Sequence, residues 1–220
     1  MTGALLDAQA EFELKQRVAA LESATGVEAV VSVIARADSY PEIPWKAFAL
    51  GASLASLAAV AAALLEPGWE AAGAVAETAV AALAAGGAAA LATVWVAPFA
   101  RLFLPRTRRR AEVLQYAQAM FLEAELHRTR RRDGILLLVS LFEHEVVVLA
   151  DRGVREKLGS AGLGPVVAAT TARLARGLLK DALLEGLARL EQVLEENGFR
   201  AQPGDANELP DSVIQRREPS

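Results

Sequence analysis

The sequence predicts a small α/β domain that is interrupted by a pair of long apolar helices. Two segments, residues 47–65 and 78–100, contain no charged residue. At about 1.5 Å per helical residue, each is long enough to cross most or all of a ~30 Å hydrocarbon layer. A short stretch that carries Glu66, Glu70 and Glu77 separates them, so together they predict a transmembrane helical hairpin. On either side of this hairpin, β-branched runs and amphipathic helical patterns follow one another, which is typical of a sheet covered by helices.

The composition of the 220-residue chain excludes several kinds of catalytic and metal site. The chain has no cysteine, which excludes disulfides, thiolate catalysis and cysteine-bound zinc, and its two histidines offer little material for a histidine-based metal site. The net charge of −4 hides an arginine cluster, residues 106–110, close behind the second apolar segment. Cationic flanks favour the cytoplasmic side of a membrane. We therefore expect two helices in the inner (cytoplasmic) membrane, with both termini cytoplasmic and the acidic loop outside. The first residues lack the basic start of a signal peptide.

Small residues dominate the predicted hairpin, among them Gly51, Ala55, Ser56, Gly86 and Gly87. Helices in lipid associate by close van der Waals packing, and small side chains permit this packing. The alternative is a buried helical hairpin of a soluble protein, because alanine is only weakly apolar and glycine weakens a helix by roughly 1 kcal/mol.

The remaining elements follow from periodicity and from turn residues. We expect helices over 7–24, 108–132, 154–158, 165–179 and 180–196, strands over 27–37, 135–142 and 146–150, and a linker over 38–45. The expected organisation is a first helix and strand (1–38), the linker and hairpin (39–105), the rest of the domain (106–199) and a loosely attached polar tail (200–220).

This order of elements predicts a three-layer α/β/α sandwich with a small mixed sheet, in which a helical crossover makes the first two strands parallel. The hairpin leaves from the end of the first strand, so we expect Asp38 and the turn Glu143–His144–Glu145 to face the membrane. The opposite end of the sheet then gathers the arginine-rich segment 128–133 and the segment 151–153.

The segment from Leu126 to Leu141, followed by 146–154, resembles the TPM domain family, which takes its name from thylakoid, photosystem and acetylcholine-receptor-associated members. It looks more like the bacterial membrane branch, in which a transmembrane hairpin interrupts the domain and a tail like Gly204–Asp211 follows. The resemblance covers roughly Glu11 to Ile214 and implies a compact α/β/α sandwich. It also implies three roles described for members: weak acid phosphatase, divalent-cation binder and accessory protein of a membrane complex. Many extracytoplasmic members carry an acidic pair in the turn that is Phe142–Glu145 here.

The arginine-rich end supplies the candidate ligand-binding residues Arg128, Thr129, Asp151 and Arg152. Guanidinium groups beside a hydroxyl and a carboxylate match a phosphate or a carboxylate. The alternative is that the cations complement a helix dipole and that Asp151–Gly153 is ordinary turn chemistry.

Other polar groups give weaker indications. A metal site at Glu143–Glu145 competes with an ordinary polar turn, and His127 suits a helix surface better than a general base. The cluster 106–110 suits anionic headgroups, while the absence of an aromatic platform argues against a nucleic-acid partner.

We therefore expect a membrane-anchored cytoplasmic module that acts through protein contacts, with the lipid bilayer and a membrane protein complex as partners. The rival hypothesis is a weak phosphomonoesterase, with a divalent cation such as calcium or magnesium as its cofactor. Oligomeric state and catalytic residues stay open at this point.

Overall fold

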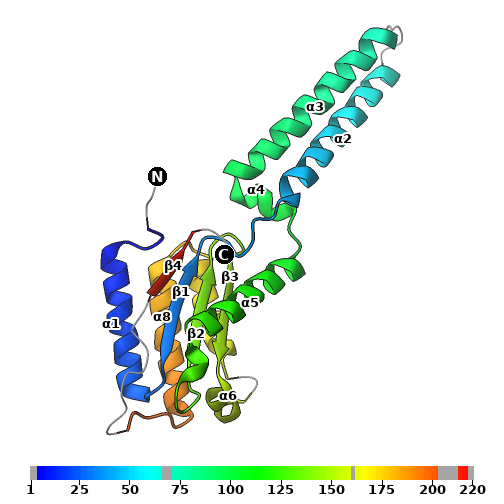
Figure 1. Cartoon of the computed structure of the whole chain (residues 1–220). Helices are drawn as coiled ribbons and strands as arrows, with labels where there is room; N and C mark the ends of the chain where they lie inside the picture. Colours follow the sequence, from blue (N-terminus) through cyan, green and yellow to red (C-terminus); the bar gives the residue numbers. More distant parts are fainter. Residues whose placement is uncertain (1–3, 66–70, 160–161, 203–212, 218–220) are drawn as a thin grey trace. The chain divides into compact units, whose positions relative to one another are not determined.

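A computed structural model describes residues 4–65, 71–159, 162–202 and 213–217 of the chain. The chain divides into two compact units (Figure 1). The first, Met1–Asp38 with Arg109–Ser220, is called the sandwich unit below. The second, Ser39–Arg108, is called the hairpin unit. The acidic loop residues Glu66 and Glu70 lie outside the described residues.

A four-stranded mixed sheet forms the middle of the sandwich unit. The strands are β1 (Ala29–Ile34), β2 (Ile135–Ser140), β3 (Glu145–Ala150) and β4 (Val213–Arg216), in the order β3-β2-β1-β4. β1 pairs in parallel with β2, from Ala29 opposite Ile135 to Ile34 opposite Ser140. β2 and β3 pair antiparallel. The predicted parallel crossover and the predicted β-hairpin are therefore both confirmed.

Helices cover both faces of this sheet, as the three-layer prediction requires (Figure 1). One core joins the sheet to α1 (Ala8–Thr25), α6 (Arg152–Leu158), α7 (Gly164–Leu174) and α8 (Leu179–Glu196). The other core joins the opposite face to α5 (Arg106–Glu123) and to Leu126 of the short 3-10 helix η1 (Leu126–Arg128). Every residue of β1 and β2 is buried, because both faces of these two strands are covered.

Local signals explain where α1 begins and ends. The Asp7 side chain accepts a hydrogen bond from the Ala10 amide at 2.6 Å, which caps the first turn. Gly26 adopts a left-handed conformation (φ 68°), and its amide donates to the Glu22 carbonyl at 2.7 Å. This arrangement is a glycine C-cap, and it confirms the helix stop expected at Thr25–Gly26.

The helix expected over 108–132 is shorter than predicted. α5 ends at Glu123, because Glu125 takes a left-handed conformation (φ 55°) and the chain continues through η1. A second left-handed residue, Arg132 (φ 55°), turns the chain into β2. Gly134 packs so closely that a Cβ there would overlap the carbonyl oxygen of Leu126. The helical periodicity of the sequence continues past this break, which explains the error.

The C-terminal segment is not simply a loose tail. Residues 213–216 form β4, which pairs in parallel with β1, and the Ala35 amide donates to the Arg216 carbonyl at 2.8 Å. The Gln215 side chain accepts a hydrogen bond from the Leu6 amide and donates one to Glu11. The prediction was wrong for this part because a half-polar strand of four residues is stabilised by its neighbours and not by its own composition.

The hairpin unit contains α2 (Glu42–Leu65), α3 (Ala71–Trp95) and α4 (Ala97–Leu102). α2 and α3 lie side by side (Figure 1). A Cβ at Gly51 would lie 2.7 Å from the Ala85 carbonyl oxygen, and one at Gly86 would lie 2.8 Å from the Phe48 ring. Small residues thus permit the close packing expected from the sequence.

Two boundaries of the hairpin differ from the prediction. The expected linker stops at Glu42, where α2 begins, because Pro44 lies in the first turn and its missing N–H is not needed there. The second segment breaks at Val96, and Pro98 falls in the first turn of α4. An ion pair connects the beginning and the end of the hairpin unit: the Arg108 guanidinium lies 2.5 Å from the Glu42 carboxylate.

Candidate functional site

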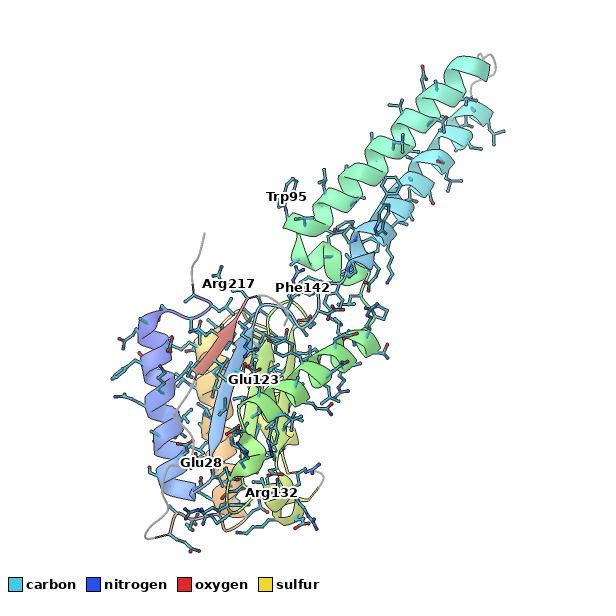
Figure 2. All side chains as sticks on the ribbon, viewed as in Figure 1. Glu28, Trp95, Glu123, Arg132, Phe142 and Arg217 are labelled. Carbon is cyan, nitrogen blue, oxygen red and sulfur yellow. The ribbon has the colours of Figure 1, made fainter. Side chains whose placement is uncertain are left out.

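The arginine-rich end of the sheet is built by the turn that leads into β2 and by the start of α6. Figure 2 shows Glu28 and Arg132 at this end, and Phe142 and Arg217 at the other end. The Gly153 amide donates to the Arg132 carbonyl at 2.9 Å. A Cβ at Gly153 would lie 2.5 Å from the carbonyl oxygen of Arg131, so glycine is required for this close approach.

The first two predicted ligand residues have separate roles. Thr129 is buried, and its hydroxyl oxygen accepts a hydrogen bond from the Asp133 amide at 3.0 Å, which closes the turn. Arg128 is exposed and pairs with Glu125 at 2.5 Å. The hydroxyl therefore stabilises the turn, while the guanidinium lies on the surface.

The other two predicted residues begin α6. Asp151 is its N-cap, and its Oδ1 accepts a hydrogen bond from the Arg152 amide at 2.7 Å. In the described structure the Oδ2 atom is buried without a hydrogen bond and forms an ion pair with Arg132 at 3.6 Å. The Arg152 side chain is 76% exposed and pairs with Glu156 at 2.6 Å, a bond that raises the pKa of the guanidinium. The side chains of Arg128, Thr129 and Arg152 thus make separate local contacts in the described structure, and Asp151 contacts only the backbone amide of Arg152 among the other three predicted residues.

A polar pocket of about 310 Å³ lies at the same end of the sandwich unit. Its lining comes from the end of α1, the turn before β2, α6 and the segment after α8. The charged residues in the lining are Arg131, Asp133, Lys157 and Arg200. Lys157 and Arg200 were not among the candidates, because they are distant in sequence from the arginine-rich segment. The basic residue two positions after the helix stop Asn197–Gly198 is the signal that could have found Arg200.

The turn at the other end of the sheet is more than a surface turn. Glu143 is fully buried, and its carboxylate accepts hydrogen bonds from the Ala37 amide at 2.9 Å and from the Ser140 hydroxyl. Its carbonyl accepts from the Arg109 guanidinium at 3.3 Å. Both chain segments that lead to the hairpin unit therefore meet at Glu143.

The other weaker candidates remain without an assigned role. Within the described residues, no group of three histidine, cysteine, aspartate or glutamate side chains is placed to hold a metal ion. His127 lies in η1, and its Nδ1 atom is buried without a hydrogen-bond partner there.

Comparison with known proteins gives the family. An NMR structure of the BA42 protein, from the psychrophilic bacterium Bizionia argentinensis, matches with a TM-score of 0.58 and 13% sequence identity over 98% of each chain, which shows a common fold. The search of curated proteins found no match. The family model described as "TPM domain" matches residues 77–193, which is more than half of the sequence. That match begins inside α3, while α1, β1 and β4 complete the same sandwich outside it. The chain therefore belongs to the TPM domain family.

Proposed function

We propose that this protein is a TPM module anchored in the inner (cytoplasmic) membrane by its hairpin unit, and that it acts there through protein contacts as an accessory of a membrane complex. The observation that carries the proposal is the exposure of the two long apolar helices. In the best spanning windows, mean hydropathy is 2.1 for α2 and 1.6 for α3, yet none of the first window and 11% of the second is buried. Helices of a soluble core would bury such residues.

The outward faces of α2 and α3 carry large apolar side chains. Those more than half exposed include Leu54, Leu57, Val60, Leu64, Val75, Val80, Leu83 and Val94. A contiguous apolar surface on this scale is characteristic of a membrane or protein contact. The hydroxyls of Ser56 and Thr93 bond to carbonyls in their own helices, at 2.9 and 2.6 Å, so lipid would not leave these two groups unpaired.

Charged substitutions test the anchor. Leu54→Lys with Leu57→Lys should cost about 5–7 kcal/mol of insertion free energy, because each lysine near a helix centre costs about 2.5–3.5 kcal/mol. The variant should lose resistance to carbonate extraction from membranes. The matched control, Leu122→Lys with Leu178→Lys, changes exposed leucines of the sandwich unit and should stay in the membrane fraction. A wild-type chain that is soluble without detergent would refute the proposal.

The proposed topology places both termini in the cytoplasm, because arginines follow the second helix. The chain has no cysteine, so single cysteines report accessibility without background. In spheroplasts, an impermeant maleimide should label Gly73→Cys and leave Glu195→Cys unlabelled until lysis. The reverse pattern would overturn the topology.

The interaction role is supported by the separate local contacts of Arg128, Thr129 and Arg152. The second candidate function is a phosphomonoesterase in which Asp151 is the acidic participant. It is favoured by the buried Asp151 Oδ2 atom, which no hydrogen bond satisfies within the described structure. Aryl phosphate hydrolysis, measured with and without calcium or magnesium, distinguishes the two. Activity that falls in Asp151→Ala and Arg152→Ala would favour the enzyme, while activity no higher than background in the wild type would favour the interaction role.

A further inference from the structure

The pocket at the arginine-rich end has an excess of positive charge. Three of its lining residues are cationic, Arg131, Lys157 and Arg200, and one is anionic, Asp133. Asp133 is largely buried, and its Oδ2 accepts a hydrogen bond from the Arg131 Nε at 3.0 Å. Because this pair neutralises the carboxylate, the charges of Lys157 and Arg200 dominate the pocket.

In the described part of the chain, Lys157 and Arg200 contact carbonyl oxygens and an aromatic ring and no carboxylate. The Lys157 ammonium donates to the Gly198 carbonyl at 2.9 Å and lies 4.1 Å from the centre of the Phe199 ring. The Arg200 guanidinium donates to the carbonyls of Glu195 and Phe199 at 3.4 and 3.2 Å. Within the described part of the chain, neither side chain forms an ion pair with a carboxylate.

Both cations lie at the C-terminal end of a helix, which explains part of their position. The Arg200 guanidinium caps a carbonyl in the last turn of α8, and Lys157 lies in the last turn of α6, where a cation complements the helix dipole. These contacts use one donor of the three on the lysine and one nitrogen of the guanidinium. No described residue uses the remaining donors, so they can bond to a ligand in the pocket.

The backbone brings the two cations to one place. Gly198 takes a left-handed conformation (φ 75°), which glycine adopts without strain and which leads the chain from α8 into Phe199 and Arg200. The volume, about 310 Å³, is at the small end of the range of ligand pockets. A pocket of this size lined by exposed cations suits a compact anion.

We propose that the pocket lined by Arg131, Lys157 and Arg200 binds a compact oxyanion of the phosphate class, and that it binds this anion without turnover. Lys157 contributes a point charge, and Arg200 contributes planar donors that match two oxygens of the ligand. The phosphate group comes either from a soluble phosphorylated molecule or from the headgroup of an anionic lipid. The pocket lining does not include Asp151 or Arg152, so the proposal does not depend on hydrolysis.

Calorimetric titration of the full chain in nanodiscs with inorganic phosphate tests the site. In nanodiscs of neutral lipid we expect saturable binding, weakened at least tenfold in Lys157→Gln and in Arg200→Gln. The matched control is Arg155→Gln, which removes a cation of the same helix that lies outside the pocket lining, and it should bind like the wild type. Urea midpoints of all three variants show whether each remains folded.

A second arm identifies the source of the phosphate group. In nanodiscs that contain phosphatidate, apparent affinity for inorganic phosphate should fall if the lipid headgroup occupies the pocket, and stay unchanged if the ligand is soluble. Either result is compatible with an oxyanion site. No binding of phosphate in neutral nanodiscs, or binding that is equally strong in the two pocket variants and in the control, would overturn the proposal. Because inorganic phosphate is not a hydrolysable ester, this outcome is independent of the phosphatase assay.

Discussion

Two adjacent glycines in α3 have opposite surroundings, which allows a sharp test of how the hairpin packs. A Cβ at Gly86 would lie 2.8 Å from two ring carbons of Phe48 and 3.0 Å from the Phe48 carbonyl oxygen. A Cβ at Gly87 would have no described atom within 4 Å apart from its chain neighbours and the backbone of its own helix. Gly86→Ala should therefore weaken the association of α2 with α3, and Gly87→Ala should not.

The expected magnitude follows from these distances. Carbon atoms in contact prefer a separation of about 3.5 Å or more, so the new methyl group would be roughly 0.7 Å too close to the ring. Overpacking of this kind typically costs about 1–3 kcal/mol. The gain in helix propensity, up to about 1 kcal/mol, is the same for both substitutions. The difference between the two variants is therefore the overpacking cost, which corresponds to about a 5- to 150-fold change in the association equilibrium.

Energy transfer between two dyes measures this equilibrium. The chain has no cysteine of its own, so Lys46→Cys with Val94→Cys provides specific attachment points on α2 and α3. Titration with a denaturing detergent in mixed micelles then gives the midpoint of helix separation for each glycine variant. Equal midpoints for Gly86→Ala and Gly87→Ala, or a lower midpoint for Gly87→Ala, would refute the assigned packing.

Three further predictions concern the sandwich unit and are measured as urea midpoints by pulse proteolysis or as amide exchange. Glu143→Ala should cost about 1–3 kcal/mol, because the Ala37 amide loses its buried acceptor, and Glu143→Gln should cost less; equal costs would contradict this role. Hydrogen bonds from Gln9 and from Lys180 lower the pKa of Glu13, and the bond to Glu13 raises the pKa of Lys180. The stabilisation by this pair is therefore present above the ordinary carboxyl pKa and lost as the pH falls through the lowered one. Likewise, it is present below the ordinary lysine pKa and lost as the pH rises through the raised one. Lys180→Met should remove the dependence at high pH and reduce the one at low pH, where the Gln9 bond to Glu13 remains, and a pH profile unchanged from the wild type would exclude the pair as their source. Gln215→Ala should speed amide exchange in β4, while Gln192→Ala on the surface of α8 should leave it unchanged.

The fold was predictable where a segment carries its own hydrophobic signal. β2 and β3 are continuous apolar runs, and α1 has both a cap and a glycine stop, so the type of each element could be predicted. β4 could not, because its strand conformation depends on pairing with β1. The early end of α5 also depends on tertiary packing, since Gly134 must lie against the Leu126 carbonyl.

The site was less predictable, because it depends on which side chains meet in space. Adjacent residues such as Asp151 and Arg152 could be assigned to one end of the sheet from topology alone. Their sequence did not show that one begins α6 and that the other turns outward to Glu156. The meeting of Arg131 with Lys157 and Arg200 requires the known positions of three separate elements.

Glu143 explains how the sandwich tolerates a long insertion between β1 and α5. The chain leaves through Ala37 and returns through Arg109, and both residues donate hydrogen bonds to Glu143. The six residue pairs between β1 and β2 are complete, so the insertion does not interrupt the sheet. An exposed carboxylate would add little to such a junction. The fully buried Glu143 carboxylate loses its hydration and depends on the Ala37 amide and the Ser140 hydroxyl, while the Arg109 guanidinium donates to the backbone carbonyl of Glu143. Glu143 therefore connects the segment that leads into the insertion with the segment that returns from it, through its carboxylate to Ala37 and through its carbonyl to Arg109.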